Sequence, residues 1–268
     1  MKAFVLDISI CNGCYCCQIA CKDEHVGNDW APYARPQPDT GQFWLKVNEF
    51  VRGTVPKVKM HYLPVLCMHC DDAPCIKSCP VDGAMYKRPD GLVIIDTSKC
   101  TGCRSCVDAC PYHVIFYNED LNLAQKCTGC AHLLDDGWKE PRCVDVCPTG
   151  ALKFVDEFEI KDIMSKAEVL KPEAGTKPRV FYLNIPKKFI AGTVYDPVQK
   201  EVIIGAVGTL TGKGGTLTKA TDGFGDFWFE GLAVGDYSLK IEAKGFPSKT
   251  FNNISTEKDV NLGDIPLA

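Results

Sequence analysis

Hydrophobic and polar residues alternate in several short stretches of the first 155 residues, and each stretch predicts a strand. The chain begins with MKAFVLDIS, and GQFWLKVNEFV at residues 41–51 alternates so that one face is expected to be buried. A hairpin is predicted over residues 83–100, with its turn at Pro89-Asp90-Gly91. Shorter strands are predicted over residues 114–127 and 150–156. This recurrence of short strands indicates an internal repeat.

The pattern changes after residue 155. Residues 157–170 (EFEIKDIMSKAEVL) predict a helix, and residues 175–188 predict an extended arm. From residue 189 onward, short apolar runs are interrupted by Gly, Asp and Pro roughly every 8–12 residues, which is typical of a small β-sandwich. The glycine-rich stretch at 208–216 lacks the spacing and the hydroxyl residue of a phosphate-binding loop, so a hairpin turn is expected there.

Sixteen of the 17 cysteines fall into four runs, and no cysteine follows residue 147. The first and third runs have the spacing C-x2-C-x2-C-x3-C. The second is C-x2-C-x4-C-x3-C and the fourth is C-x2-C-x12-C-x3-C. In chain order, the runs are Cys11, Cys14, Cys17 and Cys21; Cys67, Cys70, Cys75 and Cys79; Cys100, Cys103, Cys106 and Cys110; and Cys127, Cys130, Cys143 and Cys147.

This spacing is that of bacterial ferredoxins, in which three close cysteines hold one 4Fe–4S cluster and the distant fourth reaches a second. Four runs therefore predict four clusters, and a chain with so many clusters is expected to carry single electrons. Gly13, Gly102 and Gly129 lie inside two-residue gaps, where a positive φ relieves the tight turn. Zinc is the main alternative, since C-x2-C pairs also form zinc sites, although three cysteines at this spacing crowd one tetrahedral ion. A disulfide scaffold is disfavoured because the chain shows no signal peptide.

Other candidate residues have weaker signals. Cys16 lies inside the first run, but the spacing assigns Cys17 as the ligand, so Cys16 is expected not to bind iron. Lys126 and Arg142 adjoin predicted ligands and either raise a cluster potential or are simply solvated. The histidines are expected to be structural or to support the ligands, because no catalytic motif accompanies them; they are His25, His61, His69, His113 and His132.

Charge and composition narrow the class of protein. The formal net charge is −4, and each oxidised cluster with four thiolates adds about −2, so the loaded protein is acidic. No basic stripe indicates nucleic-acid binding, and no apolar run approaches the roughly 20 residues that cross a bilayer. We expect a chain that is soluble or held at a membrane only by a partner. It is expected in the cytoplasm, or in the periplasm after co-export with a signal-bearing partner.

The expected fold is α+β. Residues 1–155 form a double ferredoxin-like, four-cluster domain with an insertion at 22–62 that packs on the core or docks a partner. Residues 156–188 form a helix and a linker arm. Residues 189–268 form a small all-β sandwich.

The order and spacing of the four runs resemble the iron–sulfur subunits of molybdenum or tungsten bis-pterin oxidoreductases, the dimethyl-sulfoxide reductase family. That family pairs the first run with the fourth and the second with the third. The resemblance implies a large molybdopterin-containing catalytic partner, and substrate and pterin sites only in that partner. It also implies four ligand sets, which are Cys11, Cys14, Cys17 and Cys147 (site a); Cys127, Cys130, Cys143 and Cys21 (site b); Cys67, Cys70, Cys75 and Cys110 (site c); and Cys100, Cys103, Cys106 and Cys79 (site d).

A narrower likeness extends along almost the whole chain. The stretches CKDEH, CMHC, AQKCTGCAHLLDD and GTKPRVFY, with the terminal sandwich, resemble the small subunits of the family's aromatic transhydroxylase branch. The sandwich, with TDGFGDFWF at residues 221–229, is similar to transthyretin-like and carboxypeptidase-regulatory-like domains. In that branch the third run is eroded, whereas here Cys100, Cys103 and Cys106 are all present.

The complete third run favours an enzyme that exchanges electrons with an outside carrier. The resemblance therefore implies an electron-transfer subunit for a hydroxylase, dehydroxylase or transhydroxylase of polyhydroxylated aromatics. The alternatives are a subunit of another anaerobic respiratory reductase, of the arsenate, polysulfide or sulfoxide type, and a free polyferredoxin. The sandwich is expected to bind the large subunit or a second copy of the complex.

Overall fold

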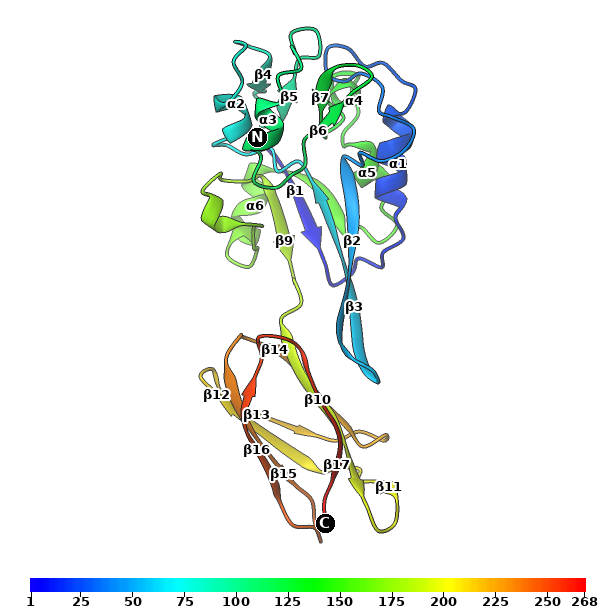
Figure 1. Cartoon of the computed structure of the whole chain (residues 1–268), viewed down its shortest axis with the longest axis vertical. Coiled ribbons are helices and arrows are strands. Elements are labelled where there is room, and N and C mark those ends of the chain that lie inside the picture. The colour runs from blue at the N-terminus through cyan, green and yellow to red at the C-terminus, as the bar shows by residue number, and fades with distance from the viewer. The chain divides into compact units, whose positions relative to one another are not determined.

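The computed structural model describes all 268 residues and consists of two compact units (Figure 1). The first unit comprises Met1–Glu49 and His61–Ile185, and the second comprises Phe50–Met60 and Pro186–Ala268. All helices belong to the first unit, and the second contains only strands and loops. Strand and short helix together give the α+β character that the sequence predicts.

A three-stranded sheet with the order β8-β1-β9 forms one part of the first unit. β1 (Lys2–Asp7) lies in its centre, antiparallel to β8 (Leu152–Asp156) and parallel to β9 (Val180–Leu183). Four consecutive residues of β1, from Ala3 to Leu6, are buried, as expected for a strand covered on both faces.

Short paired strands follow the cysteine-rich loops. β4 (Met85–Lys87) pairs with β5 (Val93–Ile95), and β6 (Phe116–Asn118) pairs with β7 (Leu123–Gln125). The predicted turn between β4 and β5 is present, since Gly91 has φ +95° and its N–H donates to the Arg88 carbonyl. The short helices are α1 (Cys16–His25), α2 (Pro74–Lys77), α3 (Ser105–Ala109), α4 (Ala131–Asp135), α5 (Arg142–Asp145), α6 (Glu157–Met164) and the 3-10 turn η1 (Pro172–Ala174).

The predicted helix over residues 157–170 ends early, at Met164. Beyond it, the backbone of Glu168 exchanges two hydrogen bonds with that of Tyr182, at 2.8 Å each, so this segment pairs with β9. The predicted linker arm is also largely part of the first unit. Its residues Val180–Leu183 form β9, and the Asp71 N–H donates to the Lys177 carbonyl at 2.9 Å. Tertiary pairing therefore overrides the local sequence preference.

The predicted β-sandwich is built from two four-stranded sheets. In one, β10 (Lys188–Asp196) pairs with β11 (Glu201–Val202), β14 (Asp226–Leu232) and β17 (Val260–Pro266). In the other, four strands lie side by side in the order β13 (Gly215–Ala220), β12 (Val207–Gly212), β15 (Asp236–Glu242) and β16 (Lys249–Ser255). β12 and β13 pair up to Gly212 and Gly215, so the glycine-rich stretch is the expected hairpin turn.

The TDGFGDFWF stretch has a structural role at the start of β14. The buried Thr221 hydroxyl accepts from the Ala206 N–H and donates to the Ile203 carbonyl. The Asp222 carboxylate accepts from two backbone N–H groups, those of Phe224 and Asp226. This turn directs Phe227 and Phe229 into the sandwich core, where both are at most 2% exposed.

Part of the predicted insertion belongs to the second unit. β2 (Leu45–Thr54) and β3 (Lys57–Leu66) form a hairpin whose tip, residues 50–60, packs with sandwich residues. The Arg52 guanidinium makes two hydrogen bonds to the Asp259 carboxylate, at 2.9 and 2.6 Å. Lys57 pairs with Asp226 in the same unit. The tip therefore packs with the sandwich, which is neither of the two alternatives that the sequence suggested for the insertion.

Candidate iron–sulfur sites

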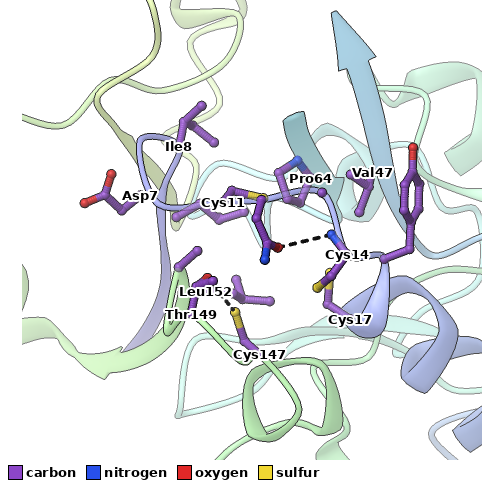
Figure 2. A pocket seen from close by; sticks show the side chains of 15 residues that line it. Asp7, Ile8, Cys11, Cys14, Cys17, Val47, Pro64, Cys147, Thr149 and Leu152 are labelled. Atoms are coloured by element: carbon purple, nitrogen blue, oxygen red, sulfur yellow. Dashed lines mark hydrogen bonds between the residues drawn. The ribbon is translucent and has the colours of Figure 1, made fainter. Parts of the chain in front are cut away.

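The first candidate site is a cavity between the first and fourth cysteine runs (Figure 2). Cys11 and Cys14 enter it from the loop after β1, Cys17 from the first turn of α1, and Cys147 from the loop before β8. Apolar side chains complete the wall, among them Leu6, Val47 and Leu152. The cysteine set is the one that crosswise pairing predicts for site a.

Two further cavities bring together cysteines of the second and third runs. One is lined by Cys67, Cys70, Cys75 and Cys110, with Val93 and Tyr112 beside them. The other is lined by Cys79, Cys100, Cys103 and Cys106, with Met85 and Ile95 in its wall. In each, the fourth cysteine comes from the other run, so these are the groupings predicted for sites c and d.

The remaining four cysteines influence one another electrostatically. Burial raises the pKa of the Cys21 thiol well above its usual value, and Cys127 and Cys130 raise it further. Burial likewise raises the pKa of Cys143, with added contributions from Cys130, Cys21 and Cys127. These mutual effects are consistent with the predicted site b, and Cys17 of site a contributes to both thiols as well.

The ligand loops have a common backbone conformation. Gly13, Gly102 and Gly129 have φ of +68°, +72° and +63°, as the sequence predicts. A Cβ at Gly102 would lie 2.5 Å from the Asn122 carbonyl oxygen, so a side chain there meets backbone. In the second run, His69 occupies the equivalent position with φ +44°. It is buried, and its Nδ1 accepts from the Val93 N–H at 3.0 Å, which holds the ring in place.

Burial raises the pKa of many of the candidate ligands. Burial raises the pKa of Cys17, Cys75 and Cys130 to about 12, and that of Cys70, Cys106 and Cys127 to about 11. A thiolate at such a position needs a compensating cation, and iron supplies one. The donor set therefore fits four iron–sulfur clusters.

A single metal ion is less compatible with this geometry. No group of three or more His, Cys, Asp or Glu side chains converges closely enough to hold one ion anywhere in the chain. The cysteines instead surround cavities. Soft thiolates in groups of four, spaced around a volume, are the arrangement that an iron–sulfur cluster requires.

Cys16 differs from its neighbours. It is exposed, starts helix α1, and is absent from the residues that line the cavity of site a. A hydrogen bond with Cys14 raises the pKa of its thiol. The four positions around that cavity are already provided by other cysteines.

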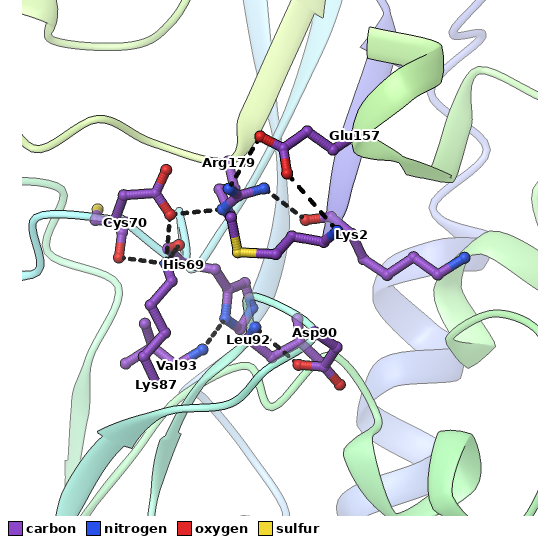
Figure 3. Close-up of polar contacts among 11 residues, drawn as sticks. Lys2, His69, Cys70, Lys87, Asp90, Leu92, Val93, Glu157 and Arg179 are labelled. Carbon is purple, nitrogen blue, oxygen red and sulfur yellow. Dashed lines mark hydrogen bonds and ion pairs between the residues drawn. The ribbon is translucent and has the colours of Figure 1, made fainter.

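A polar network that the sequence did not predict surrounds the loop of site c (Figure 3). Lys87 donates to the backbone carbonyls of His69 and Cys70, at 3.1 and 2.9 Å, and pairs with Asp71. Asp71 also accepts from Arg179 at 2.6 Å. The network joins β4, the ligand loop and the segment before β9. Only the GTKPRVFY likeness at residues 175–182 marked that segment in the sequence.

Thr176 adds a direct contact to the same site. Its side chain is buried, hydrogen-bonds to the Cys70 thiol, and lies 2.6 Å from the Tyr112 hydroxyl oxygen. Neither side chain was singled out from the sequence: Tyr112 lies two residues after Cys110, and Thr176 lies in the GTKPRVFY stretch, but no ligand spacing indicates a contact with Cys70.

The five histidines occupy different environments. His25 and His69 are 1% exposed, and His132 lies 3.0 Å from the Glu24 carboxylate. His25 packs against Trp44 with ring centroids 4.6 Å apart. His113 is exposed, with φ +53°, and His61 lies in β3. No cavity lined by cysteines includes any of these rings among its lining residues.

The two cations flanking ligands also differ. Lys126 is 2% exposed, whereas the Arg142 side chain is 28% exposed and pairs with Glu24 and Asp145.

No helix of the chain is long and apolar enough to cross a membrane.

Comparisons with known proteins identify iron–sulfur relatives. A family model described as a 4Fe–4S dicluster domain matches residues 58–157, and a carboxypeptidase regulatory-like domain matches residues 190–267. The chain is 38% identical to the pyrogallol hydroxytransferase small subunit of Pelobacter acidigallici over 276 residues, which cover 98% of each chain.

Other relatives match a smaller part of the chain. A tetrathionate reductase subunit of Salmonella typhimurium is 38% identical over 70% of this chain and 74% of its own length. The arsenate respiratory reductase iron–sulfur subunit of Shewanella sp. is 34% identical over 67% of this chain and 94% of its own. Given these identities and the gathered cysteine sets, the chain belongs to the iron–sulfur, electron-transfer subunits of the dimethyl-sulfoxide-reductase family of molybdopterin oxidoreductases.

Proposed function

We propose that the chain holds four 4Fe–4S clusters at sites a, b, c and d and conducts single electrons to or from a molybdopterin catalytic subunit. The observation that carries this proposal is the crosswise gathering of the cysteines. Three cavities are each lined by three cysteines of one run and the last cysteine of another. When bound, each cluster supplies a one-electron redox centre.

The protein's own residues hold these centres and exclude water from the middle ones. All eight cysteines of sites b and c are buried. By contrast, Cys14 of site a and Cys103 of site d are exposed, and their sites include further half-buried cysteines. This arrangement suits a protein in which electrons enter at one exposed cluster, pass two buried clusters, and leave at the other exposed cluster.

Shared loops support the order a-b-c-d. Sites a and b exchange Cys21 and Cys147, and sites c and d exchange Cys79 and Cys110. Sites b and c meet where the Cys67 backbone hydrogen-bonds to the Cys127 thiol. Sites a and d are then the two ends of the series.

The surfaces near the two ends differ. Next to the ligands of site a, Ile10 and Ile19 are 46% and 62% exposed. Around site d, Arg104 pairs with Glu119 and Lys99 with Asp96. Permanent interfaces are apolar, whereas charged rims suit partners that associate and leave. We therefore assign the catalytic subunit to the site a end and an outside electron carrier to the site d end.

The proposed substrate class is polyhydroxylated aromatics. The relative that matches along 98% of the chain, the sandwich included, is the small subunit of a pyrogallol hydroxytransferase. The intact Cys100, Cys103 and Cys106 favour a hydroxylase or dehydroxylase that exchanges electrons with a carrier. The alternatives are a subunit of another anaerobic reductase, which the shorter relatives favour, and a free polyferredoxin.

The sandwich is proposed to bind the catalytic subunit or a second copy of the complex. Exposed apolar side chains at one end of it suit this role, namely Val198 (85%), Val202 (43%), Ile204 (66%) and Phe224 (78%). A double Ile204→Ser and Phe224→Ser chain is expected to keep its iron but to lose partner affinity or oligomeric order. Unchanged assembly in analytical ultracentrifugation would leave the sandwich as a passive appendage.

The experiment for the main proposal compares Ile10→Ser plus Ile19→Ser with Arg104→Ala. The first pair should weaken co-purification of the pterin-containing subunit. Arg104→Ala should leave that complex intact and slow its reduction or oxidation by soluble carriers. Purification of the wild-type chain alone, with all clusters and no pterin-containing partner, would support the polyferredoxin alternative.

A further inference from the structure

The position of Lys126 is unusual for a lysine. It directly precedes Cys127 at the end of the β7 loop and is 2% exposed. Its ammonium donates to the Cys127 carbonyl at 3.0 Å and to the carbonyl of Val93. Cys127 belongs to site b, and Val93 lines the cavity of site c. The charge therefore lies where the two middle sites adjoin.

No carboxylate accompanies this ammonium. Within 4.0 Å of its nitrogen there is no Asp or Glu oxygen, and its two hydrogen bonds go to neutral carbonyls. A buried ion without a partner of opposite charge is costly, by several kcal/mol or more in real proteins. The neighbouring thiols are the available source of negative charge.

Two other cations near the middle sites serve as comparisons. Lys87 contacts only the site c loop, is 23% exposed at its side chain, and pairs with Asp71. Arg142 contacts only site b, is 28% exposed, and pairs with Glu24 and Asp145. Greater exposure weakens a charge through solvent screening, so Lys126 should act most strongly.

We propose that Lys126 is a counter-ion shared by sites b and c, and that it raises the reduction potentials of both middle clusters together. The proposal rests on the proposed function, because it requires clusters at these two sites. Reduction adds one negative charge to a cluster, and a nearby positive charge in a water-poor region stabilises the reduced form. The side chain would thereby keep the two middle centres accessible to electrons from either end.

The test uses the full-length chain, prepared anaerobically, with Lys126→Gln and Lys126→Arg compared with wild type. Gln keeps a hydrogen-bond donor without charge, and Arg keeps the charge. Iron content and midpoint potentials from an EPR-monitored redox titration are the readouts. Cys14→Ser and Cys103→Ser chains identify the signals of sites a and d. Lys87→Gln and Arg142→Gln are the matched controls.

We expect the Lys126→Gln chain to keep its iron and to have lower midpoint potentials at the two middle clusters. The midpoint potentials of sites a and d should not change. The Lys126→Arg chain should have potentials close to those of wild type. Lys87→Gln should shift only site c, and Arg142→Gln only site b, each by less. If Gln loses iron from sites b and c while Arg retains it, the charge is needed to hold the clusters, which also supports the proposal.

Two results would overturn it. One is a Lys126→Gln chain with full iron in which neither or only one middle midpoint falls. The other is equal iron loss in Gln and Arg, which would show that packing matters and charge does not. A wild-type chain without clusters at sites b and c would instead contradict the proposed function itself.

Discussion

Cys67 and Cys127 belong to different cysteine runs, and a hydrogen bond from the Cys67 backbone opposes the rise in pKa that burial gives the Cys127 thiol. Cys67 belongs to site c and Cys127 to site b. Hydrogen bonds to a thiolate stabilise its charge and influence the potential of the metal centre that it binds. This contact connects the pair of sites a and b to the pair c and d, and it is the basis for the proposed order of four sites.

Crosswise ligation predicts which cluster each cysteine supports. Cys21→Ser should damage the cluster at site b, although Cys21 follows Cys11, Cys14 and Cys17 in sequence. Cys17→Ser is the matched control, since it should damage site a. EPR and Mössbauer spectra of the two variants should therefore differ in the signal lost. Loss of the same signal in both would show that the first run holds a cluster by itself.

Cys16 is predicted to be dispensable for iron binding. Cys16→Ala should leave the iron content at the wild-type value, because the thiol is exposed and does not line the cavity of site a. The matched control is a Cys14→Ala substitution in the wild-type chain, which should remove iron from site a. Loss of a complete cluster from Cys16→Ala alone would mean that the register of the first run is wrong.

The buried His25 predicts a pH dependence of stability. Burial, assisted by the charge of His132, lowers the pKa of His25 to about 3 from its usual 6.5. Between these values the unfolded chain binds the proton and the folded chain does not, so stability falls as pH drops below 6.5. The loss is on the order of a few kcal/mol.

The His25→Phe substitution keeps a ring against Trp44. Between pH 7.5 and pH 5, the melting temperature of this variant should therefore fall by less than that of wild type. His113→Asn is the control, because His113 is exposed and asparagine tolerates its positive φ. An identical pH dependence for wild type and His25→Phe would contradict the assignment of His25 as a buried neutral histidine.

The Arg52–Asp259 pair predicts that the hairpin tip stabilises the sandwich unit. Their side chains are 12% and 7% exposed, and Asp259 also accepts from the Phe189 N–H at 3.0 Å. Asp259→Asn should lower the opening free energy of residues 186–268 by about 3–5 kcal/mol, the usual effect of leaving one buried charge unpaired. Amide hydrogen exchange of the full chain measures this directly.

The exposed pair of Lys240 and Glu242 provides the comparison, with side chains 49% and 52% exposed. Lys240→Met should change the same exchange rates very little. If Asp259→Asn and Lys240→Met had equal effects, the hairpin tip would not be part of the sandwich's stabilising core.

The sequence predicted those features that depend on short-range spacing. The cysteine intervals and the glycines at 13, 102 and 129 identify the ligand loops, since only certain gaps allow such turns. The period-2 runs similarly predict the strands of the sandwich. The turn conformation of His69 could not be predicted in this way. Its positive φ is supported by a hydrogen bond from Val93, which lies 24 residues away in sequence.

Features that depend on distant contacts were not predictable from the sequence. The segment after Met164 pairs with Tyr182 and does not continue the helix, and residues 50–60 pack with the sandwich. Lys126 was recognised as a neighbour of a ligand, but its burial comes from elements that fold around it. Side chains brought together by tertiary structure carry no periodic signal in a single sequence.

The central claim is that this chain holds four 4Fe–4S clusters, and the most direct test is the iron and acid-labile sulfide content of the anaerobically prepared wild-type protein, with a Cys103→Ser chain beside it. The account predicts about sixteen of each per wild-type chain, and an integrated EPR intensity of about four spins after full reduction. Cys103→Ser should affect only the site d signal. A wild-type value near twelve or below, with no signal sensitive to Cys103→Ser, would contradict the four-cluster account.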